Sequence, residues 1–230
     1  MAGGKPTVST KSGSGVRNLK QRVKTANKRS LSSQKWLERQ LNDPYVARAK
    51  REGYRSRAAF KLTEIDDRFH LIRKGSRVVD LGCAPGGWLQ VALERGATSV
   101  AGVDLLPVEP VPGAYILQAD FTDPEVGPQL LQALGGPPDI VLSDMAPNTV
   151  GHRQTDHLRI VGLIELAAEF AIANLAPGGA FVTKAFQGGE MEAVLARLKA
   201  TFDTVKHAKP KASRADSSEV FLAAVGRKRS

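Results

Sequence analysis

The chain has 230 residues, of which 42% are hydrophobic, and a formal net charge of +10. This length suits one domain with a sizeable core. A single cysteine, Cys83, excludes an internal disulfide and a cysteine-rich zinc site. No apolar run approaches the roughly 20 residues of a membrane span, and the N-terminus lacks the apolar segment of a signal peptide. We therefore expect a cytoplasmic protein rather than an exported or membrane protein.

The positive charge is unevenly distributed along the chain. Residues 1–60 hold 15 Lys and Arg against 3 acids, whereas the remainder holds 18 against 20. A basic segment joined to a nearly neutral remainder predicts binding to a polyanion, of which nucleic acid is the usual example. The alternative is a solubilising tail.

The N-terminal segment divides into two parts. Residues 1–27 are rich in Gly, Ser, Thr and Lys without a hydrophobic period, which predicts a disordered basic tail. Residues 28–230 are predicted to form a single domain whose first part, 28–70, consists of basic helices. Within that part the apolar spacing predicts helices at 33–41, 45–52 and 58–69.

From Arg77 onward, short apolar runs alternate with helical patterns, which is typical of a parallel sheet. The predicted helices cover 89–94, 129–134, 156–175 and 190–200. The predicted strands cover 78–81, 99–105, 114–120, 139–147, 180–186, 202–210 and 219–226. The loop before the last strand is too short for a crossover helix, so that strand is expected to be antiparallel. The sequence thus predicts an α/β, Rossmann-like, doubly wound and mostly parallel seven-stranded sheet with an antiparallel last strand.

Residues 77–88, RVVDLGCAPGGW, break an apolar run with a glycine-rich turn that permits close approach of a ligand. Its spacing, Gly82-x-x-x-Gly86-Gly87, differs from the G-x-G-x-x-G of dinucleotide sites and disfavours a nicotinamide cofactor. S-adenosylmethionine (AdoMet) carries a sulfonium and an ammonium group, which need carboxylates, and Asp80 fits that demand. The alternative is a plain tight connection.

Four acids follow the predicted strands: Asp80, Asp104, Asp120 and Asp144. Ligands of doubly wound sheets bind beyond the carboxyl ends of the strands. Asp104 has the spacing from the glycine turn that suits a carboxylate on ribose hydroxyls, and Asp120 could accept a hydrogen bond from an adenine amino group. Each acid alone is more often a helix cap or turn residue, but four on one edge favour a ligand site.

The strings DLGCAPGGW, GVDLLP, QADF, SDMAPN, VTKAFQG and SSEVF occur in order, and residues 33–225 resemble the RlmE/FtsJ family of AdoMet-dependent ribose 2′-O-methyltransferases. The resemblance implies the AdoMet-dependent methyltransferase fold. It also implies methylation of a uridine in the A loop of large-subunit (23S) rRNA, on the assembled or late-assembling 50S subunit. A tRNA 2′-O-methyltransferase and a ribosome-assembly RNA-binding factor without turnover remain alternatives.

The family's catalytic set, Lys-Asp-Lys-Glu, falls on Lys61, Asp144, Lys184 and Glu219. Together with the reading of the strand ends, the resemblance gives a cofactor set of Asp80, Gly82, Gly86, Gly87, Trp88, Asp104, Asp120 and Asp144. The departures from the family pattern are the long segment before residue 28 and Cys83, where a smaller residue is common. Taken singly, Trp88 could equally be a core residue.

Methyl transfer to a ribose hydroxyl requires a base within hydrogen-bond reach of that hydroxyl. Lysine is a base only when neutral, so the site must lower its pKa from about 10.4 by burial or a neighbouring cation. We predict Lys184 as the base, Lys61 as the source of positive field, and Asp144 and Glu219 as orienting groups. No metal is expected, because the reaction transfers no phosphoryl group and the histidines lack the pattern of a metal site.

Phosphate contacts position an RNA without specifying its sequence. The predicted contacts lie in the N-terminal basic segment: Lys35, Arg39, Arg48, Lys50, Arg51, Arg55 and Arg57. The rim of the site could be completed by Arg153, Lys209, Lys211 and Arg214. We expect the protein to bind the large ribosomal subunit as a monomer, with neither DNA nor a membrane as a partner.

Overall fold

The computed structural model describes residues 38, 40–147, 153–186, 191–214 and 217–229; for residues 153–157 it describes only the backbone. The predicted tail at 1–27, its boundary with the domain and most of the helix at 33–41 lie outside these residues. Met1–Pro44 and Tyr45–Ser230 form two compact units, and the sheet belongs to the second.

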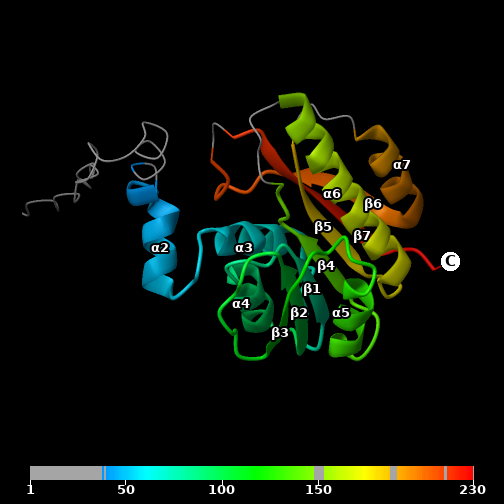
Figure 1. Cartoon of the computed structure of the whole chain (residues 1–230), viewed down its shortest axis with the longest axis horizontal. Helices are drawn as coiled ribbons and strands as arrows, with labels where there is room; N and C mark the ends of the chain where they lie inside the picture. The colour runs from blue at the N-terminus through cyan, green and yellow to red at the C-terminus, as the bar shows by residue number, and fades with distance from the viewer. Residues whose placement is uncertain (1–37, 39, 148–152, 187–190, 215–216, 230) are drawn as a thin grey trace, which may run out of the picture. The chain divides into compact units, whose positions relative to one another are not determined.

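Seven strands form one sheet in the order β3-β2-β1-β4-β5-β7-β6 (Figure 1). The strands are β1 (Arg77–Leu81), β2 (Ser99–Asp104), β3 (Ala114–Gln118), β4 (Ile140–Ser143), β5 (Ala180–Phe186), β6 (Phe202–Ala208) and β7 (Glu219–Arg227). Strand β7 is antiparallel to both of its neighbours, and the pairs among β1 to β5 are parallel. The predicted mostly parallel sheet with an antiparallel last strand is therefore confirmed.

The helices are α2 (Pro44–Glu52), α3 (Ala58–Phe69), α4 (Gly87–Glu94), α5 (Val126–Leu134), α6 (Arg153–Asn174) and α7 (Glu192–Thr201). Helix α3 has the predicted bounds, whereas α4 and α5 begin two and three residues before the predicted positions. Gly87 opens α4, and Pro128 lies in the first turn of α5. A first-turn N–H has no partner within its helix, so glycine and proline are tolerated there although they weaken a sequence signal.

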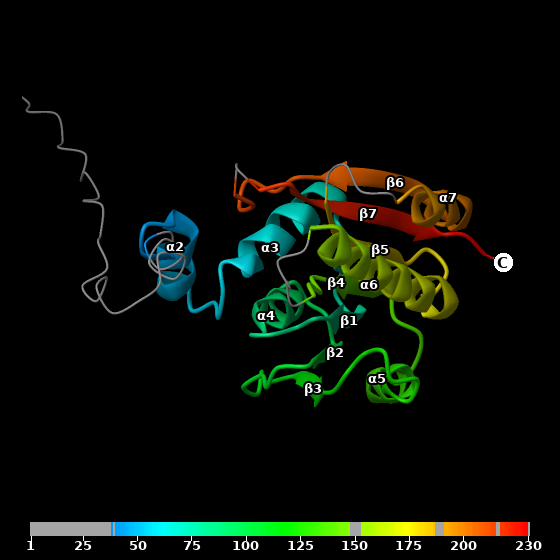
Figure 2. The same ribbon diagram turned by 45° about the horizontal axis from the view of Figure 1, so that its top comes forward.

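Helices cover both faces of the sheet (Figures 1 and 2). Buried side chains of α5, α6 and α7 pack on one face, where Val79 and Leu81 of β1 point. Buried side chains of α3 and α4 pack on the other face with Val78. This doubly covered arrangement explains why the strands read as continuous apolar runs rather than as alternating ones.

The alternation of side chains places three charged residues of the strands, Asp80, Lys184 and Glu219, on one face. Asp80 follows Val78 by two residues, and Lys184 follows Val182 by two residues, so both lie on the face covered by α3 and α4. Lys184 pairs with Phe221 in the β5–β7 register, and Phe186 pairs with Glu219. Glu219 therefore lies on the same face as Lys184, toward the helix that carries Lys61.

The connection from α3 to β1 is fixed by a buried carboxylate. Asp66 Oδ1 accepts hydrogen bonds from the backbone N–H groups of Leu71 and Ile72, both at 2.8 Å. Asp66 Oδ2 accepts a hydrogen bond from Arg95 Nη1 at 2.9 Å. Because Arg95 follows α4, this carboxylate links the end of α3 to the end of α4. Among the described residues, no helix is long and apolar enough to cross a bilayer.

Candidate active site

The glycine-rich turn at the end of β1 has no room for larger residues. Gly82 has a φ of 81°, and a Cβ atom there would lie 2.9 Å from the Cα and backbone N of Met145. Gly86 has a φ of 106°, and its Cβ would lie 3.0 Å from Arg55 Nη1. Both positions favour glycine for backbone conformation and for space. The turn is thus closely packed against Met145 and Arg55, and the approach of a ligand to it stays a prediction.

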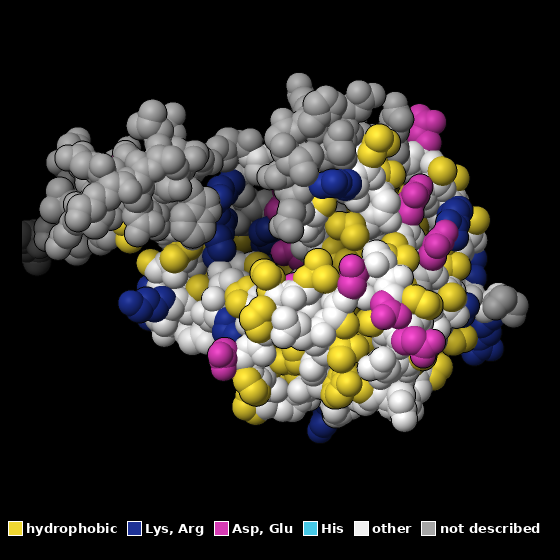
Figure 3. All heavy atoms as spheres, viewed as in Figure 1, with side chains coloured by type: hydrophobic (Ala, Val, Ile, Leu, Met, Phe, Trp, Pro, Cys, Tyr) yellow, Lys and Arg dark blue, Asp and Glu magenta, His cyan; other side chains and the backbone are white. Residues whose placement is uncertain are grey.

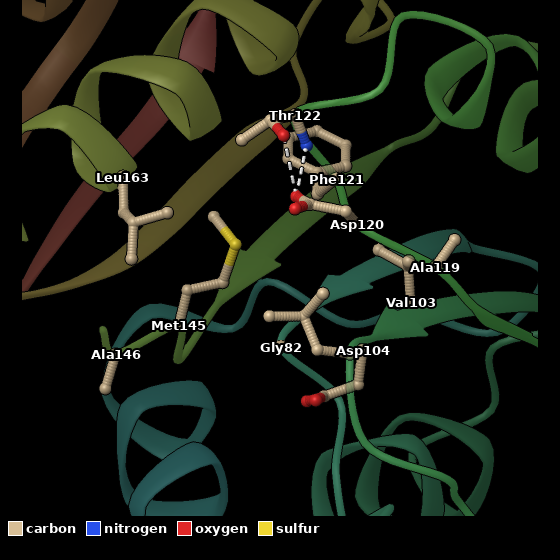
Figure 4. Close-up of a pocket in the computed structure, with 11 residues that line it drawn as sticks. Gly82, Val103, Asp104, Ala119, Asp120, Phe121, Thr122, Met145, Ala146 and Leu163 are labelled. Atoms are coloured by element: carbon tan, nitrogen blue, oxygen red, sulfur yellow. Dashed lines mark hydrogen bonds between the residues drawn. The ribbon is translucent and has the colours of Figure 1, made fainter. Parts of the chain in front are cut away.

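A cavity of about 110 Å³ lies beyond the ends of β1, β2 and β3 (Figure 4). Three predicted residues line it: Gly82, Asp104 and Asp120. Asp104 accepts hydrogen bonds from the backbone N–H groups of Ala84 and Leu106, both at 2.9 Å, so it ties the end of β2 to the glycine turn. The cavity therefore forms where the sequence predicted a ligand crevice.

Asp120 presents a stabilised negative charge at this cavity. Its Oδ1 accepts hydrogen bonds from the backbone N–H of Thr122 at 2.9 Å and from the Thr122 hydroxyl at 2.8 Å, drawn as dashed lines in Figure 4. The backbone hydrogen bond, followed by that of the hydroxyl, lowers the pKa of Asp120 below its ordinary value. Asp120 is therefore an anion at neutral pH.

Asp80 is a buried carboxyl group without a hydrogen-bond partner. The residue is 1% exposed, and neither side-chain oxygen has a partner among the described residues. Burial raises the pKa of Asp80 well above its ordinary value, and the nearby charges of Asp144 and Asp104 raise it further. An unpaired buried carboxyl group is costly, so its retention beneath the glycine turn favours a site for a cationic ligand.

Two ion pairs lie on the face of the sheet covered by α3. Lys184 Nζ is 2.8 Å from Asp144 Oδ1 and donates a hydrogen bond to the backbone carbonyl of Asp144 at 2.7 Å. Lys61 Nζ is 2.7 Å from Glu219 Oε1. Lys184 is only 8% exposed, which is rare for a lysine unless it is paired. The four residues predicted as the catalytic set thus form two salt bridges.

The two salt bridges are electrostatically linked through Glu219. Burial opposes ionisation of this carboxyl group, but the charge and hydrogen bond of Lys61, the hydrogen bond of Ser213 and the charge of Lys184 lower its pKa below the ordinary value. Glu219 is therefore ionised at neutral pH and senses both lysines. Protonation changes at any member of such a cluster affect the others.

Other predicted cofactor residues lie outside the lining of the cavity. Trp88 is buried in the core, where its indole N–H donates to the carbonyl of Ala58 at 2.8 Å and its ring packs against Phe221. Gly87 begins α4, and a Cβ there would lie 2.8 Å from Ser56 Oγ. Both residues pack against other parts of the protein in this structure, and their contact with a cofactor stays a prediction.

The cavity also has lining residues that the sequence reading missed. Met145 and Leu163 face Val103 and Asp120 across the cavity in Figure 4. The further missed lining residues are Val103, Leu105, Ala119, Phe121, Thr122 and Ala146. Three of these residues directly follow a predicted acid: Leu105, Phe121 and Met145. A search that included the residue after each strand-end acid would have found them. Leu163 lies inside a long helix and carries no such signal.

The predicted RNA contacts fall into different structural settings. Arg48 and Arg51 are exposed on α2, where both pair with Glu52, and Lys50 is exposed beside them. Arg55 instead donates to the carbonyls of Glu109, Pro85 and Pro110, the last at 2.6 Å. Its guanidinium thus braces the loop after β2 against the glycine turn. The sequence did not indicate this internal role.

Arg57 is also engaged within the protein, because it donates a hydrogen bond to the carbonyl of Ala212. Of the residues predicted at the rim, Lys211 is exposed, and Lys209 donates to the carbonyl of Ser217 at 2.7 Å. Lys35, Arg39 and the side chain of Arg153 lie outside the described residues.

Acidic side chains gather over α6 and its neighbours on the face shown in Figure 3. Exposed acids of these elements include Glu165 and Glu169 on α6, of which Glu169 pairs with Arg197 Nη1 at 3.0 Å, and Asp123 and Glu125 before α5. Negative charge of this kind repels phosphate groups.

The chain is similar to known methyltransferases along most of its length. The model of the FtsJ-like methyltransferase family matches residues 54–227. Ribosomal RNA large subunit methyltransferase E of Caulobacter sp. (strain K31) is 67% identical over 205 residues, which is 89% of this chain and 91% of that protein. The protein of the same name from Granulibacter bethesdensis is 58% identical over 226 residues, covering 98% and 96%.

Among solved structures, a protein described as a ribosomal RNA methyltransferase from Plasmodium falciparum superposes with a TM-score of 0.68. It shares 30% sequence identity, and the match covers 76% of this chain and 98% of that chain. Family match, sequence identity and fold agree over the region that holds the cavity and both salt bridges. The chain belongs to the FtsJ-like methyltransferase family.

Proposed function

We propose that this protein transfers a methyl group from AdoMet to the ribose 2′-hydroxyl of a uridine in the A loop of large-subunit rRNA. The observation that carries this proposal is the buried Lys184–Asp144 salt bridge, which lies next to Lys61–Glu219 on one face of the sheet. Such a cluster can remove a hydroxyl proton and stabilise the resulting charge. The names of the relatives support large-subunit rRNA as the substrate.

The residues around the cavity fit AdoMet in charge and space. A positively charged cofactor suits a region that holds Asp80, Asp104 and Asp120, because its charge would compensate the unpaired carboxyl group of Asp80. The side chains of Met145 and Leu163 offer apolar surface for a heterocyclic ring. AdoMet supplies, when bound, a methyl group activated by the adjacent sulfonium.

The basic surface supports RNA as the second substrate. Arg48, Lys50 and Arg51 are exposed on α2, just ahead of the helix that carries Lys61. Phosphate contacts there would hold the RNA near the salt bridges without selecting a base. Choice of one uridine would then depend on the shape of the A loop in the assembled or late-assembling 50S subunit. We accordingly place the reaction in the cytoplasm, where bacterial subunits are assembled.

In the proposed reaction, Lys184 accepts the proton of the 2′-hydroxyl as the oxygen attacks the methyl carbon. The new O–C bond forms while the C–S bond breaks, and its electron pair remains on sulfur. Lys184 must be a neutral amine at that moment. Asp144 orients Nζ through its carboxylate and its backbone carbonyl. The ammonium group of Lys61, held by Glu219, stabilises negative charge that develops on the 2′-oxygen.

The proposal is tested by methyl transfer from labelled AdoMet to 50S subunits that lack the modification, with free rRNA and tRNA in parallel, followed by mapping of the labelled nucleotide. Label on one A-loop uridine as 2′-O-methyluridine supports the proposal. Label on tRNA keeps the reaction and replaces the substrate. Binding of AdoMet without transfer to any RNA favours an assembly factor without turnover.

The role of Lys184 is tested by two substitutions with different chemistry. Lys184→Ala removes the base, and we expect single-turnover rates to fall about 10²- to 10⁴-fold with AdoMet affinity retained. Lys184→Arg keeps a cation near Asp144, but arginine does not deprotonate in proteins, so it should be similarly slow. Lys206→Ala, on the exposed surface of β6, is the matched control. An active Lys184→Arg variant would show that the cation, not the base, is what the reaction requires.

A further inference from the structure

A buried serine contacts the same carboxylate oxygen as Lys61. Ser213 is 6% exposed, and its hydroxyl donates a hydrogen bond to Glu219 Oε1 at 2.9 Å. Lys61 Nζ lies 2.7 Å from that same oxygen. A carboxylate held by two donors has fewer accessible orientations than one held by a single lysine, whose side chain has four rotatable bonds.

The segment that carries Ser213 is attached to α3. Glu64 on α3 accepts hydrogen bonds from the backbone N–H groups of Lys211 at 2.5 Å and Ala212 at 3.2 Å. Arg57 donates to the carbonyl of Ala212 from just before the same helix. These three contacts fix the backbone immediately before Ser213.

Apolar packing adds to this attachment. Ala212 is fully buried in a small cluster with Phe60 of α3 and Ala49 of α2. The backbone N–H of Ser213 donates to the carbonyl of Pro210 at 2.9 Å, which closes a turn. The position of the Ser213 hydroxyl is therefore set by the helix rather than by a free loop.

Helix α3 thus acts on Glu219 along two routes. Lys61 reaches the carboxylate directly, and Glu64, three residues later on the same side of the helix, holds the turn that brings Ser213 to it. A movement of α3 relative to β7 would alter both contacts together. The arrangement explains why a serine hydroxyl is buried at this point although a neighbouring lysine already neutralises the carboxylate.

We propose that Ser213 is a positioning residue for methyl transfer: its hydroxyl holds the carboxylate of Glu219 in the orientation that binds and directs the ammonium group of Lys61. This proposal rests on the proposed function. The charged groups that face Glu219 are Lys61 from α3 and Lys184 from β5, with Asp144 paired to Lys184 behind it. Ser213 contributes a second hydrogen bond to the same carboxylate oxygen that Lys61 contacts.

The test compares Ser213→Ala with Ser217→Ala. Ser217 is the matched control because its hydroxyl also contacts Glu219. The Ser217 hydroxyl accepts a hydrogen bond from the backbone N–H of Glu219 at 3.1 Å and does not bind the carboxylate. We expect Ser213→Ala to lower kcat about tenfold, the equivalent of about 1.4 kcal/mol for one lost hydrogen bond to a charged group, with KM for AdoMet and for subunits unchanged. Ser213→Thr, which keeps the hydroxyl, should restore most of the rate. Ser217→Ala should be close to the unsubstituted protein.

A second readout does not depend on turnover. The Ser213 hydrogen bond is one of the contacts that lower the pKa of Glu219. Its loss should raise that pKa in a carbon-13 NMR titration of the Glu219 carboxyl group, and should move the acidic limb of the pH–kcat profile in the same direction. Ser217→Ala should cause neither change. An upward shift specific to Ser213→Ala, together with a lower kcat, supports the proposal.

The proposal is overturned if Ser213→Ala keeps the Glu219 titration unchanged, whatever its rate, or if Ser217→Ala reproduces all of its effects. A failure of the proposed function looks different, because the unsubstituted protein would then methylate no large-subunit RNA. In that case the titration still decides whether Ser213 controls the Glu219 carboxylate.

Discussion

Replacement of Asp66 by alanine should destabilise the protein more than any exposed acid on the same surface. Asp66 has a side chain that is only 3% exposed, and it satisfies the buried backbone N–H groups of Leu71 and Ile72. Each donor left unpaired costs about 1 to 3 kcal/mol. The partly exposed pair with Arg95 adds about 0 to 1 kcal/mol, because solvent screens it.

We therefore expect Asp66→Ala to lower the free energy of unfolding by about 2 to 7 kcal/mol. At about 2 to 4 °C per kcal/mol for a chain of this size, Tm should fall by about 4 to 28 °C. Circular dichroism during thermal unfolding, together with urea titration, measures both quantities. Asp66→Asn keeps an acceptor for both N–H groups but loses the charge and the acceptor for Arg95, so its effect should be smaller.

Asp67→Ala is the matched control, because Asp67 is the next residue and also pairs with Arg95, at 2.7 Å, but its side chain is 60% exposed. Its loss should cost less than about 1 kcal/mol. Equal losses for Asp66→Ala and Asp67→Ala would refute the reasoning, because the stabilisation would then come from the charge of Arg95 and not from the buried backbone hydrogen bonds.

Two further substitutions probe the glycine turn. Gly82→Ala should lose about 1 to 3 kcal/mol more stability than Gly178→Ala and bind AdoMet more weakly in calorimetry. Both glycines have a φ near 80°, but only a Cβ at Gly82 meets the backbone of Met145, so equal losses would contradict the steric argument. In the folded protein the pKa of Asp80 is raised above 3.8, first by burial and then by the charges of Asp144 and Asp104. The folded state therefore binds the Asp80 proton more tightly than the unfolded state does. As a result, the free energy of unfolding falls as pH rises from about 3.8 toward the raised pKa. Asp80→Asn should lack this loss and gain stability over the unsubstituted protein in thermal scans as pH rises above about 3.8, yet bind AdoMet at least about tenfold more weakly. A parallel pH dependence of the two proteins would contradict the assignment.

Most of the fold could be predicted from local patterns. The apolar runs of β1 and β5 and the amphipathic spacing of α3 follow from the periods of strands and helices. The glycine turn and the strand-end acids Asp104 and Asp120 were also predictable, because their positions depend on where each strand ends. The sequence predicts α4 and α5 to begin a few residues after their actual starts at Gly87 and Val126, because glycine and proline in a first turn weaken the helix signal without preventing the helix.

The contacts of the site depended on long-range packing. Resemblance identified Lys61, Asp144, Lys184 and Glu219 as a set, but only the folded chain shows the pairing of Lys61 with Glu219 and of Lys184 with Asp144. Likewise, Arg55 has the same sequence signal as the exposed basic residues of α2, yet it braces two backbone segments.

Local sequence patterns are enough to predict the alternation of strands and helices, the glycine turn and the acids beyond the strands. These features depend on residues that are close together in the sequence, because such residues set the local backbone conformation and the direction of successive side chains. Only the folded chain shows which charges neutralise one another, that Trp88 packs in the core, and that Ser213 contacts Glu219. Those outcomes depend on distances between segments far apart in sequence, and electrostatic and hydrogen-bond energies vary too steeply with distance for a linear pattern to fix them.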